Sequence, residues 1–177
     1  MRGIGPAAIA VAAVIGSGAV AAANPVHAAA TFGITPGAYS YDGTYVPAGA
    51  RAQVQSVETG DGRTIVVLHV FGLLPDRDYG AHAHKFACGA LPGDAGGHFQ
   101  HVPGGATDPA FANAQNEIWL DLHTDASGNG SAMAVQDWQF AADRRPQSVV
   151  LHDHHTATDP GTAGTAGPRY ACLSVAF

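Results

Sequence analysis

Four histidines are spaced along the chain in a way that could let them bind a metal ion together. His82 and His84 form a His-x-His pair, His98 follows two glycines, and His152 ends a Val-Val-Leu run. Neutral imidazole binds zinc, copper, iron and nickel, and several imidazoles in a planar arrangement favour copper. Alternate residues of a strand share one face, so His82 and His84 are expected to point to the same side. The set therefore predicts a metal centre.

The start of the chain indicates export. A basic Met-Arg opening leads into a small, apolar stretch over residues 7–23, and an Ala-x-Ala-like site ends at Ala28. This order is typical of a secretory signal peptide, predicted here over residues 1–28, and the Ala-rich stretch is a poor membrane span. An exported chain meets oxidising surroundings, so Cys88 and Cys172 are expected to form a disulfide. The predicted location is extracytoplasmic, whether periplasm, cell wall or free secretion.

Charge and length narrow the class of protein further. The chain has 177 residues and a formal net charge of −6, which disfavours binding to nucleic acid or to an anionic membrane. Residues 29–49 are interpreted as an N-terminal linker or edge segment, and residues 50–177 as a single domain. We find no long apolar, self-complementary patch, so a monomer is favoured.

Short strands separated by turns are expected to position the histidines. Alternating or β-branched segments predict strands at 50–58, 64–71, 79–86, 117–124, 131–138, 148–152 and 169–177. Two Gly-rich stretches, 88–116 and 154–167, show no periodicity, and loops of that length are usually functional. Seven or eight strands of this kind indicate an all-β sandwich or barrel.

Several of these segments, taken in chain order over roughly residues 50–177, resemble the Cu/Zn superoxide dismutases and their relatives. The matching segments are the Gly-Ala-His-Ala-His strand ending at His84, the Gly-His-Phe around His98, the Asp/Gly hairpin at 125–130, the strand ending at His152, and the Gly-rich approach to Arg169 and Cys172. The resemblance implies a Greek-key β-barrel of about eight antiparallel strands with two long loops over the site.

The same resemblance implies roles for these residues. Copper would be held by His82, His84, His98 and His152, and Arg169 would stand beside its open position to guide a small anion. The family converts superoxide to oxygen and hydrogen peroxide by alternate reduction and oxidation of the copper, with His98 as a catalytic proton donor. The disulfide would tie the first long loop to the last strand.

The zinc site of the family is incomplete in this sequence. Beyond the shared histidine it needs two more histidines and an aspartate, and only His101 follows nearby. At the position expected for the next zinc histidine, the chain has Glu117 if the alignment is anchored on the hairpin that follows. It has Ile118 if Asp121 is matched to the aspartate of the family. The aspartate that normally links the two metal sites is also not evident, since Thr156 and Ala157 stand where it is expected. The resemblance therefore implies copper and leaves zinc doubtful.

These departures resemble the copper-only branch of the family. There a carboxylate replaces zinc by hydrogen-bonding the shared histidine, as Glu117 would do for His98. The alternatives left open are a solvated carboxylate at Glu117, an ordinary loop histidine at His101, and a remnant ligand or outer hydrogen-bond partner at Asp121. Trp119 is interpreted as a packing residue.

Two functions of different class follow. The first is an exported, copper-dependent superoxide dismutase, which Arg169 favours because storage of copper needs no anion guide. The alternative is a non-enzymatic copper-binding or delivery protein on the same scaffold. The incomplete zinc site favours this alternative. A degenerate structural domain is a third hypothesis, and the four retained histidines argue against it.

Overall fold

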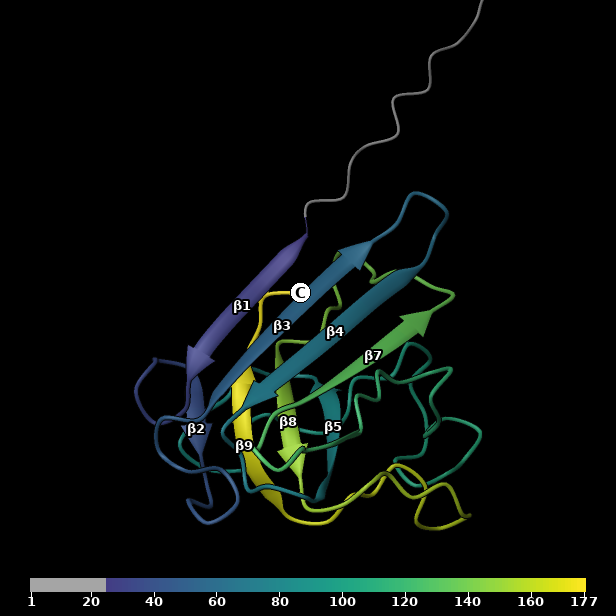
Figure 1. Cartoon of the computed structure of the whole chain (residues 1–177). Coiled ribbons are helices and arrows are strands. Elements are labelled where there is room, and N and C mark those ends of the chain that lie inside the picture. The colour runs from purple at the N-terminus through teal and green to yellow at the C-terminus, as the bar shows by residue number, and fades with distance from the viewer. Residues whose placement is uncertain (1–24) are drawn as a thin grey trace, which may run out of the picture.

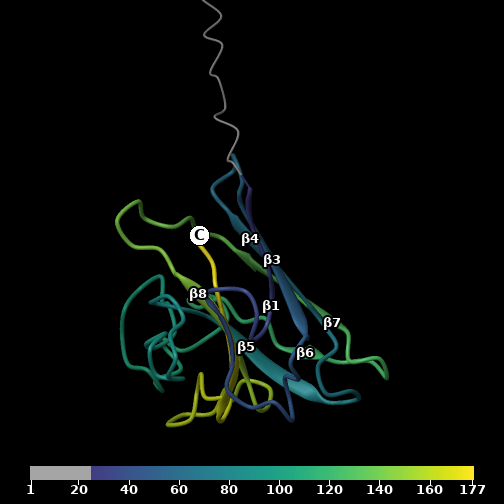
Figure 2. The ribbon, with the colours of Figure 1, turned by 90° about the vertical axis from the view of Figure 1, so that its left-hand side faces the viewer.

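The computed structural model describes residues 25–177, which form nine strands and contain no helix in that range. The strands are β1 (Val26–Thr31), β2 (Ala38–Ser40), β3 (Arg51–Glu58), β4 (Thr64–Phe71), β5 (Asp78–His84), β6 (Leu122–His123), β7 (Gly130–Gln136), β8 (Ser148–His152) and β9 (Arg169–Ser174). They build two antiparallel sheets, ordered β1-β3-β4-β7 and β2-β9-β8-β5-β6. Figures 1 and 2 show the sheets as two layers. The expected all-β sandwich is confirmed.

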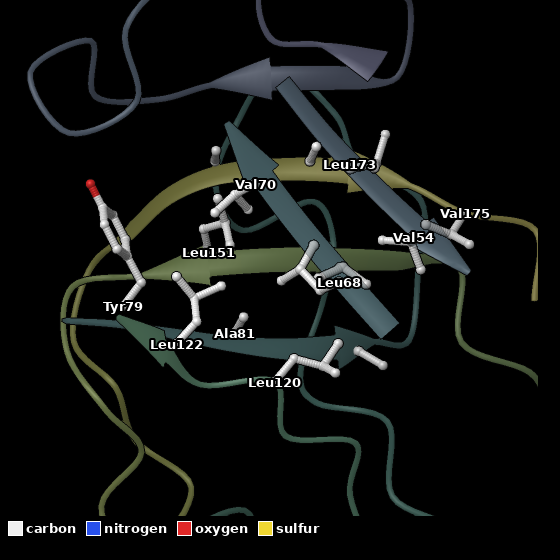
Figure 3. Close-up of a cluster of buried hydrophobic side chains, with 14 of the residues drawn as sticks. Val54, Leu68, Val70, Tyr79, Ala81, Leu120, Leu122, Leu151, Leu173 and Val175 are labelled. Atoms are coloured by element: carbon white, nitrogen blue, oxygen red, sulfur yellow. The ribbon is translucent and has the colours of Figure 1, made fainter. Parts of the chain in front are cut away.

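The first sheet has one buried face and one solvated face. In β3 the alternation is that expected from the sequence, with Ala52 and Val54 buried and the residues between them exposed. Val66, Leu68 and Val70 of β4 are buried on the same side. Figure 3 shows Val54, Leu68 and Val70 facing side chains of the second sheet in the interlayer core. This apolar interface supplies most of the burial that stabilises the sandwich.

The second sheet is buried on both faces, which explains how it can carry the histidines. All residues of β8, and all but the first of β5, are buried. Ala81 and Leu151 lie in the interlayer core (Figure 3). Neighbouring residues of a strand point to opposite faces, so His82, His84 and His152 lie on the outer face of the sheet.

Two long loops cover that outer face. The loop between β5 and β6 spans residues 85–121, and the loop between β8 and β9 spans residues 153–168. Figure 2 shows the first of them, in teal, on the side of the second sheet that faces away from the first sheet. A disulfide joins Cys88 of this loop to Cys172 of β9, with the two Cα atoms 5.7 Å apart. The expected disulfide is thus confirmed.

The segment 117–124 is a correction to the expected strands. Only Leu122 and His123 form a regular strand. Residue 117 makes an isolated β-bridge to residue 100, and residue 119 makes one to residue 82. Asp121 Oδ1 accepts the Ala81 N–H at 3.2 Å, a donor that would pair with a backbone carbonyl in a continuous ladder. A side chain thereby interrupts the pairing, while Ile118, Leu120 and Leu122 still alternate into the core.

The N-terminal part of the chain contributes more than a linker. Strand β1 forms one edge of the first sheet and β2 one edge of the second. Residues 1–24 of the predicted signal peptide lie outside the described range. Its last residues, Val26 to Ala28, pair with Val54 to Ser56 of β3. No helix in the described range has the length and apolarity of a membrane span.

Candidate metal centre

Four imidazoles converge beneath the loops. One ring nitrogen from each of His82, His84, His98 and His152 lies within 4.8 Å of the corresponding nitrogen of every other member. Strands β5 and β8 are paired neighbours and present three of the rings. The fourth, His98, comes from the 85–121 loop, where a bridge to His84 fixes its position. This is the set that the sequence predicted, and we refer to it as the histidine cluster.

Hydrogen bonds orient two of the rings with their lone pairs inward. His84 Nδ1 donates to the Gly96 carbonyl at 3.0 Å, and His152 Nδ1 donates to the Gly167 carbonyl at 3.3 Å. A neutral imidazole has one N–H, so both Nε2 atoms are then acceptors. These two Nε2 atoms lie 3.3 Å apart, an approach of two lone pairs that a cation would stabilise.

The orientation of His82 follows from the direction of a short hydrogen-bond chain. The Thr156 hydroxyl donates its single proton to Asp121 Oδ1 at 2.7 Å, so it must accept from His82 Nε2 at 2.6 Å. The other ring nitrogen, Nδ1, is therefore unprotonated. It is buried and has no hydrogen-bond partner within the described residues. An orphaned buried acceptor beside three other imidazoles fits a metal ion.

His98 is held by a buried carboxylate. Its Nδ1 donates to Glu117 Oε2 at 2.7 Å, and the Glu117 side chain is 1% exposed. Glu117 also accepts from Gln100 Nε2 at 2.9 Å and from Trp119 Nε1 at 2.8 Å. Three donors stabilise the carboxylate, and the carboxylate in turn fixes the tautomer and the orientation of the His98 ring. In the structure Glu117 is therefore a buried hydrogen-bond partner of His98 and not a solvated carboxylate.

The other expected zinc residues are not brought into the cluster. The His101 ring stacks on Trp138 with centroids 4.6 Å apart, and neither ring belongs to the metal-binding group. Asp121 binds the backbone N–H and hydroxyl of Thr156, at 2.7 Å each, and lies 3.9 Å from His82 Nε2. Asp121 therefore acts on the cluster through Thr156, while His101 is a loop histidine.

Burial keeps the strand histidines neutral. Removal from water lowers the pKa of His82 and His84 well below 6.5 and lowers that of His152 to about 3, with the neighbouring His98 adding to each shift. Neutral rings keep their lone pairs available to a metal at neutral pH.

Arg169 lines a cavity next to the cluster. This cavity has a volume of about 240 Å³ and also receives His98, Glu117 and Lys85. The Arg169 guanidinium donates to the Pro92 carbonyl at 2.7 Å and to the Gly96 carbonyl at 2.6 Å. Gly96 O, which also accepts from His84, thus connects the arginine to the cluster.

The 153–168 loop approaches β5 at a glycine. A Cβ on Gly80 would lie 2.7 Å from Ala166 Cβ and would clash with the His154 carbonyl oxygen. A residue without a side chain is needed wherever two backbones come this close. Gly80 therefore allows the loop to reach the outer face of the sheet and bring Thr156 to His82.

Three residues that contact the cluster or its neighbours were not identified from the sequence. Thr156 was noted only as the replacement of an aspartate, Trp119 was interpreted as packing, and Gln100 carried no signal. Trp119 was detectable in principle, because it shares the expected strand face with Glu117 and Asp121.

Comparison with known proteins shows the fold alone. No family model matches the chain, and no curated protein matches it in sequence. Among solved structures, a double mutant of a SOD-like protein from Bacillus subtilis has a TM-score of 0.54 and 18% identity, covering 70% of this chain and 87% of its own. The clock protein EA4 has a TM-score of 0.54 and 20% identity, covering 85% and 92%. A single mutant of the B. subtilis protein has a TM-score of 0.52 and 18% identity, covering 68% and 86%.

The chain therefore has a β-sandwich like that of SOD-like proteins, and four of its histidines could hold a metal ion.

Proposed function

We propose that the protein is an extracytoplasmic, copper-dependent superoxide dismutase. The observation that carries the proposal is a single arrangement: four inward-facing imidazoles, one of them hydrogen-bonded to a buried carboxylate, beside a cavity lined by Arg169. The disulfide is consistent with a location outside the cytoplasm.

The donor set supports copper. All four donors are imidazole nitrogens, which suit copper in both of its common oxidation states better than they suit harder cations. His98 Nδ1, the atom that would face a second metal, is occupied by Glu117. When bound, copper would exchange single electrons, so that one superoxide becomes oxygen and a second, with two protons, becomes hydrogen peroxide.

The protein's own residues would bind and orient the substrate. Arg169 and Lys85 supply positive charge to the cavity in a chain of net charge −6, and local positive charge concentrates small anions. The two carbonyls that hold Arg169 fix the direction of its guanidinium, which stays protonated at any relevant pH. Glu117 holds the proton on His98 Nδ1, so Nε2 is the ring nitrogen left to bind the metal, and the same atom could hold and transfer a proton whenever it is not coordinated.

One observation favours a second function, copper storage or delivery. The guanidinium of Arg169 already donates to two loop carbonyls, so its position also has a purely structural explanation. Under this alternative the cluster binds copper, and the cavity serves exchange of the ion with a partner instead of access for superoxide.

Dismutation by the copper-loaded protein tests the proposal against this alternative. We expect about one copper per chain and rapid removal of superoxide in a pulse-radiolysis assay. Arg169→Ala should lower the second-order rate by about tenfold or more without lowering the copper content, and Arg169→Lys should fall between the two. His84→Ala should lose both copper and activity. One bound copper with no dismutation would replace the proposal with the storage function.

Thr156 is predicted to act on the metal through His82. Thr156→Val keeps the side-chain volume but removes the hydroxyl that fixes the proton on Nε2. We expect affinity for Cu(II) to fall by about 10- to 100-fold, with a changed Cu(II) electron paramagnetic resonance spectrum. Thr156→Ser should restore both properties. Equal affinity of the valine variant and the natural protein, measured against a competing chelator, would contradict this role.

A further inference from the structure

A second group of metal-binding side chains lies on the surface, outside the histidine cluster. His123 Nδ1 is 2.8 Å from Asp78 Oδ1, and His155 Nε2 is 3.6 Å from the same oxygen. His155 Nε2 is also 3.3 Å from the Leu122 carbonyl oxygen. Two imidazole nitrogens thus lie near a single carboxylate oxygen, and one of them also lies near a backbone carbonyl oxygen.

Three separate segments bring these side chains together. Asp78 begins β5 and is the register partner of His123 in β6, so the strand pairing sets their separation. His155 comes from the 153–168 loop, and the next residue, Thr156, is anchored to Asp121 by two hydrogen bonds. The group therefore lies where the loop meets the β5–β6 edge of the second sheet.

The donors suit zinc. Two imidazole nitrogens and a carboxylate oxygen, with a fourth position left to a water or carbonyl oxygen, form a common tetrahedral zinc environment. We propose that Asp78, His123 and His155 form a second metal site, which binds a zinc ion and ties the 153–168 loop to the β5–β6 edge.

The site differs from the histidine cluster in how far it is preformed. Its side chains are 52–60% exposed, and its donor atoms are less tightly grouped than the four that lie within 4.8 Å. Exposed side chains rotate at little cost in packing, so the imidazole of His155 can turn toward the shared carboxylate. Zinc would then replace the hydrogen bond between His123 and Asp78 with two coordinate bonds.

Equilibrium dialysis of the metal-free, disulfide-bonded protein against micromolar Zn²⁺ tests the proposal. His123→Ala and Asp78→Asn should each hold one zinc equivalent fewer than the natural protein, with affinity at this site lowered about tenfold or more. His69→Ala, which removes a half-buried histidine on β4 of the first sheet, should hold as much zinc as the natural protein. Because the comparison counts a difference between variants, zinc taken up by the histidine cluster does not affect it.

Residue-resolved NMR of the imidazoles gives a second readout. Addition of Zn²⁺ should move the ring signals of His123 and His155 together, at one equivalent and in the micromolar range. Movement only at millimolar zinc would identify an adventitious ion, and unchanged zinc content in both variants would remove the site; either result overturns the proposal. The proposal does not depend on dismutation, so an inactive protein with this zinc site intact would contradict only the proposed function.

Discussion

Removal of the disulfide is expected to lower the free energy of unfolding by about 4 kcal/mol. The double variant Cys88→Ser/Cys172→Ser deletes a cross-link between residues 84 positions apart, and long closed loops restrict the unfolded chain most. Cys172 is fully buried against Val150 and Ala95, so the serine hydroxyl adds a desolvation cost. Equilibrium urea unfolding under non-reducing conditions measures the loss.

The same variant should also disturb the metal centre. Pro92 and Gly96, whose carbonyls receive Arg169, belong to the stretch of loop that begins at the Cys88 cross-link. We expect the variant to bind copper more weakly even at temperatures where it is fully folded. As a control, reduction and reoxidation of the natural protein should reproduce and then reverse both effects. A stability loss below about 1 kcal/mol would contradict the disulfide's expected contribution.

Replacement of Glu117 is expected to have the second large effect. Glu117→Ala leaves three buried or half-buried N–H donors, on His98, Gln100 and Trp119, without their acceptor. Loss of one member of a buried charged network costs about 3–5 kcal/mol. Glu117→Gln keeps the volume but offers only one acceptor oxygen, so it should cost less stability while still weakening copper binding. Thermal unfolding and Cu(II) titration of both variants measure the two effects separately.

Glu58 provides the matched control for Glu117. Its carboxylate pairs with Arg145 at 2.8 Å but remains 22% exposed and does not touch the cluster. Because partly exposed ion pairs contribute little and the glutamine oxygen can still accept the Phe140 backbone N–H, Glu58→Gln should change the free energy of unfolding by less than about 1 kcal/mol and leave copper affinity unchanged. Equal losses in the Glu58 and Glu117 variants would mean that general charge, and not contact with His98, explains the result.

The regular part of the fold could be predicted because alternation reports one-sided burial. Residues 51–58 and 64–71 alternate as expected and form β3 and β4. The edge strands β1 and β2 were less evident, since Ala-rich or three-residue strands carry little periodicity. At 117–121 the expected alternation is present, but the side chain of Asp121 accepts a backbone N–H of β5 in place of a backbone carbonyl. No sequence pattern predicts that a side chain will take this position.

Strand geometry predicts one part of the site, and the resemblance to the Cu/Zn superoxide dismutases adds the loop residues His98 and Glu117. The His-x-His spacing places two neighbouring histidines of the cluster on one face, and His152 follows on a paired strand. Contacts made by loops need the tertiary structure: His101 stacks on Trp138 instead of joining the cluster, and Thr156 reaches His82 across 74 residues. A threonine is also not a residue type that suggests metal chemistry, so its role had no local signal.

Gly80 has a consequence for how the active residues of this protein would be mapped by saturation mutagenesis. Any side chain there meets the His154 carbonyl and Ala166, so the loop that carries Thr156 cannot close on β5. Every substitution at Gly80 should therefore score as a loss of function comparable with replacement of a histidine of the cluster. A map drawn from such scores would mark as catalytic a residue that performs no chemistry and whose contribution is the space it leaves vacant.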